Sequence, residues 1–190
     1  MDSRWLLLDA RPNKDSRGIK NLGNCCFQLS VFQALLHQPS FLHWILTHNT
    51  AENACPEKHC VACFMQQLVE EYWGECPPEN PIEAARNDAG SIAWHAFQSG
   101  MFQRGAQEDA RLFYTWLLDQ FFEDVQEPRA KSWQDQHKSH FQIELQPTDT
   151  CTTCNHPTNR ALQTENILNL GILNSHKNIY DAVMDHGSIR

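Results

Sequence analysis

The sequence contains no long hydrophobic run. Its first apolar segment, Trp5–Leu8, is short, and the charged residues Asp9 and Arg11 follow at once. A secretory signal core needs about 7–15 apolar residues, and a membrane-spanning helix needs about 20. We therefore expect neither export nor a membrane partner, and we expect an intracellular chain in the cytoplasm, the nucleus or both.

A run of basic residues is also missing. The 190 residues include 15 lysines and arginines and 23 aspartates and glutamates, which gives a formal net charge of −8. Proteins that bind nucleic acid usually present clustered basic side chains to the phosphate backbone. The composition therefore argues against a nucleic-acid partner.

Internal repeats and low-complexity tracts are absent as well, and hydrophobic residues make up 41% of the chain. This content suffices for a folded core in a domain of ordinary size. The apolar spacing changes from helical to alternating along the chain. We expect an N-terminal arm over residues 1–17, a helical part over 18–138 and the start of a β-rich part over 139–190.

Several segments show the spacing of a particular secondary structure. Helices are predicted from Cys26, near Pro39, over Cys60–Trp73, over Ile92–Phe97 and over Gln107–Phe122, with Glu108 and Asp109 in the first turn of the last one. A polar linker is predicted over Glu123–Lys138. Strands are predicted around Phe141–Leu145 and over Ile167–Ile172.

Residues 18–36 read GIKNLGNCCFQLSVFQALL and place Cys25 and Cys26 before a predicted helix. A helix N-terminus favours the thiolate, which is the nucleophilic form of cysteine. Asn21 lies five residues before Cys26, and its amide can donate a hydrogen bond to an oxyanion beside the sulfur. From spacing alone, a buried structural thiol and a capping role for Asn21 remain open alternatives.

The same segment resembles the cysteine box of the ubiquitin-specific proteases. The matching positions are Gly18, Asn21, Leu22, Gly23, Asn24, Cys26, Phe27 and Ser30, and the departures are Cys25, Gln28 and Leu29. The resemblance implies hydrolysis of the bond after the C-terminal glycine of ubiquitin. It also implies that Cys26 is the nucleophile and Asn21 the oxyanion-hole residue.

A second block supports this resemblance. It comprises Gly105, Gln107–Ala110, Phe113 and Leu117–Asp119, with departures at Leu112 and Tyr114. The implied fold class is α+β, a papain-like cysteine-protease domain. The chain is expected to contain its helical thumb over 18–138 and the start of its β-rich fingers over 139–190, with most of the palm sheet missing. The apolar faces of the segments at 107–122 and 141–145 would then lack their cover.

Two groups of cysteines have spacings that suit structural zinc, and no organic cofactor is implied. The pair Cys151 and Cys154 is a half-site, which a second CxxC pair completes in the family and to which His156 is a candidate addition. A denser group consists of Cys55, His59, Cys60 and Cys63, with His48 nearby. In the alternative interpretation, Cys60 and Cys63 simply face the core of their helix.

The family's histidine box, which supplies the general base, is not found. Residues 185–188 read DHGS, a superficial similarity, and His186 is not expected to be the base. We therefore carry three hypotheses. The chain belongs to a cysteine-type deubiquitinase that acts on ubiquitinated proteins, or is a non-catalytic ubiquitin-binding or scaffold fragment, or is a zinc-stabilised helical interaction module.

Overall fold

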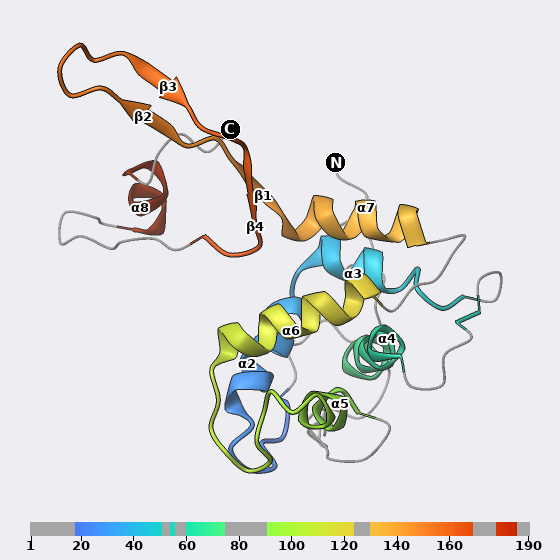
Figure 1. Cartoon of the computed structure of the whole chain (residues 1–190). Coiled ribbons are helices and arrows are strands. Elements are labelled where there is room, and N and C mark those ends of the chain that lie inside the picture. Colours follow the sequence, from blue (N-terminus) through green and yellow to red (C-terminus); the bar gives the residue numbers. More distant parts are fainter. Residues whose placement is uncertain are drawn as a thin grey trace. The chain divides into compact units, whose positions relative to one another are not determined.

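The structure, a computed structural model, describes residues 18–50, 54–55, 60–74, 91–123, 130–168 and 178–185. The chain divides into two units, Met1–Gln136 and His137–Arg190, whose elements are labelled in Figure 1. In its described residues the first unit is helical, and the second contains the strands. No helix among the described residues combines the length and the apolar content that a bilayer crossing requires.

The described helices of the first unit form a packed group that includes α2, which begins at Cys26. They are α2 (Cys26–Leu36), α3 (Pro39–Ile45), α4 (Val61–Trp73), α5 (Ile92–Gln98), α6 (Ala110–Glu123) and the start of α7 (Ala130–Phe141). Helix α6 contacts α2 and α4, α3 also contacts both of these helices, and α5 contacts α4. Helix α2 is therefore held by neighbours from two different parts of the sequence.

Aromatic side chains fill the interior of this helical unit. Phe113 of α6 contacts Phe27 and Phe32 of α2 edge to face, with ring centroids 5.7 and 5.6 Å apart. Trp44 of α3 stacks on Trp133 of α7 with ring centroids 4.1 Å apart. All five side chains are at most 5% exposed, and such ring pairs add to the stability that burial alone provides. The helix that carries Cys26 is thus fixed by its apolar face.

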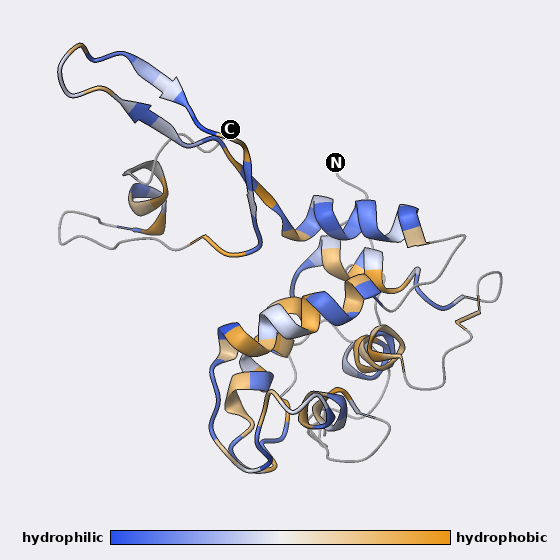
Figure 2. Cartoon of the chain, in the orientation of Figure 1, coloured by the Kyte–Doolittle hydropathy of each residue, from blue (hydrophilic) through white to orange (hydrophobic). Residues whose placement is uncertain are grey.

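The apolar face of α6 is covered within the helical unit. Its buried side chains are Phe113, Trp116, Leu117, Leu118 and Phe121, and α6 packs against α2 and α4. Figure 2 shows hydrophobic residues along these helices. The expectation that this helix leaves its apolar face without cover is therefore wrong.

Helix α6 begins at Ala110 rather than at Gln107. The Asp109 carboxylate accepts hydrogen bonds from the backbone N–H groups of Arg111 at 2.6 Å and Leu112 at 3.1 Å. This is the arrangement of an N-cap. The carboxylate of Glu108 accepts from the backbone N–H of Gln103 at 3.1 Å and closes the preceding loop. The prediction that Glu108 and Asp109 lie in the first helical turn is wrong, because one closes a loop and the other caps the helix.

The predicted linker over Glu123–Lys138 is wrong from Ala130 onward, where α7 begins; residues 124–129 lie outside the described residues. Four buried residues define one face of α7, namely Ala130, Trp133, His137 and Phe141. Their spacing of three or four residues is helical, but a histidine and many polar neighbours obscure it in the sequence. Because Phe141 ends this helix, the strand that follows starts only at Ile143.

In its described residues the second unit contains two antiparallel two-stranded sheets. Strand β1 (Ile143–Leu145) pairs with β4 (Gln163–Glu165), and β2 (Thr148–Thr150) pairs with β3 (Pro157–Asn159). Every residue of β2, β3 and β4 is exposed, and Figure 2 shows that β2 and β3 are largely hydrophilic. Main-chain pairing therefore holds these strands together. Helix α8 (Ile179–Asp185) completes the described part of this unit.

The predicted strand over Ile167–Ile172 is wrong for its described residues. Ile167 and Leu168 belong to no strand, and residues 169–172 lie outside the described residues. The strands β2, β3 and β4 went unpredicted because their residues do not alternate between apolar and polar, the signal on which a strand prediction depends.

Candidate functional site

The local structure of the cysteine box places Cys26 at the first residue of α2. Cys25 precedes the helix with a φ of −98° and a ψ of 7°, and its carbonyl accepts from the backbone N–H groups of Gln28 and Leu29. Gly23 adopts a φ of +147°, a conformation that side-chain-bearing residues rarely enter. The prediction that the helix starts at the two cysteines is confirmed.

The two adjacent thiols lie in different environments. The side chain of Cys25 is buried, with 7% of its surface exposed, whereas Cys26 is exposed. Burial raises the pKa of the Cys25 thiol, because it disfavours the charged thiolate, and charge repulsion from the neighbouring Cys26 raises it further. A reagent in solution can therefore reach Cys26, and Cys25 is kept protonated.

The side chain of Asn21 is oriented by its own loop. Its Oδ1 atom accepts hydrogen bonds from the backbone N–H groups of Gly23 at 3.2 Å and Cys25 at 3.4 Å. These two donors identify the oxygen end of the amide. The NH2 end consequently points away from them, and within the described residues it has no hydrogen-bond partner.

The two sequence blocks that carry the resemblance meet in the structure. The Nδ2 atom of Asn24 donates to the backbone carbonyl of Gly105 at 2.8 Å, across a separation of 81 residues. Gly105 has a φ of +80°, so the loop before α6 depends on a glycine at this position. This long-range contact joins the loop of the candidate nucleophile to the loop that leads into Asp109.

A base for Cys26 does not come from the described residues. Within them, no side chain hydrogen-bonds to the Cys26 thiol, and His186 lies outside them. The site as described therefore contains an exposed sulfur and an amide donor, but no imidazole placed to exchange a proton with either.

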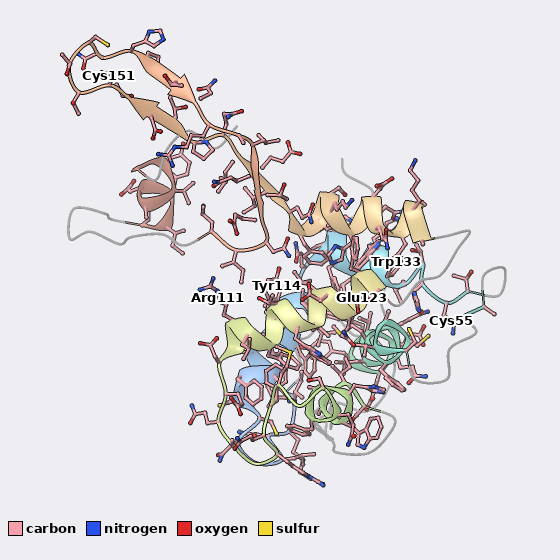
Figure 3. All side chains as sticks on the ribbon, viewed as in Figure 1. Cys55, Arg111, Tyr114, Glu123, Trp133 and Cys151 are labelled. Atoms are coloured by element: carbon pink, nitrogen blue, oxygen red, sulfur yellow. The ribbon has the colours of Figure 1, made fainter. Side chains whose placement is uncertain are left out.

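A second group of reactive side chains surrounds the start of α4. His48, Cys55, Cys60 and Cys63 each place a potential ligand atom within 4.8 Å of the other three. Three of the four belong to the predicted zinc set, and His59 lies outside the described residues. The sequence analysis named His48 only as a residue near the cysteines. Its distance from them in the folded chain depends on how the chain runs from α3 to α4. Figure 3 labels Cys55 and Trp133 in this region.

The cysteines of the predicted half-site lie on the turn between β2 and β3, where Cys151 is labelled in Figure 3. Cys151 and Cys154 are both exposed. Hydrogen bonds from the backbone N–H groups of Cys154 and Thr153 lower the pKa of Cys151 to about 7. Among the described residues no third ligand gathers with these two thiols, so the addition of His156 is not seen.

Gln28 is a buried polar residue that the sequence did not single out for a role. Its side chain is fully buried on α2, and among the described residues neither its amide oxygen nor its amide nitrogen has a hydrogen-bond partner. Such a group loses its bonds to water without replacement. The only signal in the sequence was that Gln28 departs from the usual family residue.

Comparison with known proteins bears on these observations. A family model described as ubiquitin carboxyl-terminal hydrolase matches residues 17–180. The chain is 28% identical over 153 residues to ubiquitin C-terminal hydrolase 22 of Arabidopsis thaliana, covering 73% of this chain and 25% of that protein. It is 26% identical over 113 residues to inactive ubiquitin carboxyl-terminal hydrolase 17-like protein 4 of Homo sapiens, covering 60% of this chain and 19% of that protein.

The chain is also similar to solved structures. One is the SAGA Ubp8/Sgf11/Sus1/Sgf73 DUB module bound to ubiquitin aldehyde, with a TM-score of 0.63 and 21% identity over 89% of this chain and 38% of that chain. At this identity the likeness shows the fold, so the α+β class and the partial papain-like architecture are confirmed. The chain spans 19% to 26% of the length of five curated relatives that it matches. Since the family model covers most of its residues, the chain belongs to the ubiquitin carboxyl-terminal hydrolase family, as a part of the domain.

Proposed function

We propose that this chain carries the nucleophile-bearing part of a cysteine-type deubiquitinase, with Cys26 as the nucleophile and Asn21 as the oxyanion donor. The observation that supports this most directly is the exposed thiol of Cys26 at the first residue of α2. At this position the sulfur lies next to the unpaired backbone N–H groups that begin a helix. The substrates are ubiquitin conjugates, and no organic cofactor takes part.

In the proposed reaction, the Cys26 thiolate attacks the carbonyl carbon of the last glycine of ubiquitin. The carbonyl oxygen becomes an oxyanion, to which the free NH2 end of Asn21 donates. The bond to the lysine amine then breaks, the amine leaves with a proton, and water hydrolyses the remaining thioester. A histidine delivers that proton in the intact family, and we assign no described residue to this role.

Ubiquitin with an electrophile in place of its C-terminal carboxylate tests the nucleophile. We expect one covalent adduct, mapped to Cys26 by peptide mass spectrometry. The variant Cys25→Ala should form the same adduct, whereas Cys26→Ala should form none. If the unmodified chain forms no adduct under conditions in which a relative does, or if the adduct maps to Cys25, the assignment of Cys26 is wrong.

Ubiquitin aldehyde tests Asn21, because its adduct with a thiol places an oxygen where the oxyanion would form. The variant Asn21→Asp keeps the acceptor that Gly23 and Cys25 use but replaces the NH2 donor. We expect this variant to bind ubiquitin aldehyde about 10- to 100-fold more weakly. Leu22→Ala, a change at an exposed residue of the same loop, is the control. Equal weakening in both variants would contradict the donor role.

A second candidate function is ubiquitin binding without catalysis. It is favoured by the absence of a base for Cys26 among the described residues. This function predicts that the Cys26→Ala variant still binds ubiquitin, which an NMR titration of labelled ubiquitin would detect. A titration without chemical-shift changes would exclude it.

The proposed function includes an intracellular location, in the cytoplasm, the nucleus or both. The cysteines of the described residues are free thiols, a state that a reducing compartment maintains. Fractionation of cells that express the chain would test this location.

A further inference from the structure

We propose that His48, Cys55, Cys60 and Cys63 bind one structural zinc ion, which fixes the chain between α3 and α4. The four potential ligand atoms lie within 4.8 Å of one another. In a tetrahedral site with Zn–S of about 2.3 Å and Zn–N of about 2.0 Å, ligand atoms are separated by roughly 3.5–3.8 Å. Small side-chain rotations therefore convert the observed group into a closed Cys3His site.

One pair within the group, a nitrogen and a sulfur, is already in hydrogen-bond contact. The Nε2 atom of His48 lies 3.0 Å from the Cys60 sulfur, and both side chains are 1% exposed. Cys60 directly precedes α4, and its sulfur accepts the backbone N–H of Cys63 at 3.3 Å. A sulfur in this position receives both a backbone donor and the positive end of the helix, and both stabilise a thiolate ligand.

The loop that carries Cys55 is held against α4 by a chain of hydrogen bonds. The Gln66 side chain accepts from the Asn49 backbone N–H at 3.0 Å and donates to the Asn49 carbonyl at 3.0 Å. The Asn49 side chain then accepts from the backbone N–H of Cys55 at 3.0 Å. These contacts place Cys55 beside the helix start without a metal. The ligand set is therefore largely preorganised.

The histidine ring also packs against an aromatic side chain of α7. The ring of Trp133 lies 5.0 Å from that of His48, centroid to centroid, and Trp133 stacks on Trp44 of α3. These packed rings restrict where the imidazole can turn. Burial around His48 and Cys60 excludes water, so four protein ligands would complete the coordination. The site would be structural, because no position remains open for a substrate.

Metal analysis of the purified full chain tests the site. After dialysis against metal-free buffer we expect one zinc per chain, and the double variant Cys151→Ser/Cys154→Ser should keep it. The cobalt-substituted protein should show the visible bands of tetrahedral Co²⁺ together with thiolate charge-transfer bands. A folded wild-type chain without bound zinc and without these bands would overturn the proposal. This result is independent of whether Cys26 is catalytic.

Three variants at two histidines test the ligand set. His48→Ala should lose zinc to a competing chelator, whereas His59→Ala should retain it with an unchanged cobalt spectrum. His48→Cys should retain the metal with four thiolate ligands, so its charge-transfer absorption should rise by about a third relative to three thiolates. If His59→Ala loses the metal and His48→Ala keeps it, the assignment of His48 is wrong. The wild-type and His59→Ala measurements still decide the question if His48→Ala fails to fold.

Discussion

The two units of the chain are stabilised in different ways. The helical unit buries large side chains such as Trp44, Tyr72 and Phe113, each with no exposed surface. The paired strands of the second unit expose every residue of β2, β3 and β4. Their ion pair between Arg160 and Asp149 is also exposed, and such pairs contribute little stability. Apolar burial shapes the first unit, whereas main-chain pairing and turn geometry shape the second.

The candidate sites differ in the same way, because they lie in units that are stabilised differently. The exposed Cys26 begins α2, which an aromatic core holds in place, and the cluster of His48, Cys55, Cys60 and Cys63 lies at the start of α4, where the ring of Trp133 packs against His48. Cys151 and Cys154 lie on a turn between two exposed strands. Residues that must keep a fixed geometry for chemistry are best held by rigid, packed elements. The helical unit is therefore the part in which single side-chain changes should have the largest effects.

The largest expected effect is from Phe113→Ala. Phe113 is fully buried and contacts four aromatic rings, those of Phe27, Phe32, Phe102 and Trp116. The cavity should lower the free energy of unfolding by about 3–5 kcal/mol. The control Thr158→Ala, on an exposed strand, should stay within about 0.5 kcal/mol of wild type. Urea unfolding followed by circular dichroism measures both, and equal losses would contradict the contrast between the units.

Gln28→Met should have the next largest effect, in the stabilising direction. The Gln28 amide is fully buried and lacks hydrogen-bond partners in the part of the chain that the structure describes. Replacing it with an apolar side chain of similar length removes a desolvation cost of about 1–3 kcal/mol. The exposed Gln67 on α4 offers the matched control, Gln67→Met, which should change little. A lower urea midpoint for Gln28→Met would show that the amide has a partner that compensates its burial.

Asp109→Ala should destabilise the helical unit by a smaller amount, because it removes only the cap of α6. The loss of the hydrogen bonds from Arg111 and Leu112 should cost about 0.5–2 kcal/mol. Asp109→Asn, which keeps a capping oxygen, should recover most of this loss. Asp119→Ala, at an exposed position within the same helix, serves as the control. Thermal unfolding would detect the difference, and equal effects at both positions would contradict the capping role.

The smallest effect concerns reactivity in the second unit rather than stability. The pKa of Cys151 is lowered to about 7 by hydrogen bonds from Cys154 and Thr153, so its thiolate fraction should rise through neutral pH. In metal-free buffer, the alkylation rate of Cys151 should reach half its maximum near pH 7. A short peptide of the same turn sequence should reach it near pH ~8.5, the ordinary value for cysteine. Equal midpoints, measured by mass spectrometry, would show that the folded turn adds nothing.

The sequence predicted the helical part of the chain better than the strands. The start of α2 at the two cysteines follows from a local apolar pattern, and so do α3, α4 and α5. The position of Asp109 outside α6 was missed, because a carboxylate before a helix and one inside its first turn look alike in sequence. Strands β2, β3 and β4 were missed because they have no buried face and therefore no alternation to detect.

For the candidate sites too, the sequence predicted some residues and missed others. The resemblance singled out Cys26 and Asn21, and spacing singled out Cys55, Cys60 and Cys63. The sequence did not select His48 over His59, because both are near the cysteines along the chain. It also gave no sign that Cys25 is buried while Cys26 is exposed. That difference depends on which side of the helix start packs against the core.

The sequence by itself determined the family of this protein and the turn-to-helix junction at Cys26, since both depend on residues within a few positions of one another. Only the tertiary structure decided that Asn24 contacts Gly105 across 81 residues and that His48 joins the cysteines at the start of α4. Local spacing fixes hydrogen bonds within a helix or a cap. Contacts between distant segments instead depend on the packing of the aromatic core, which brings whole helices together and leaves no periodic signal in the chain.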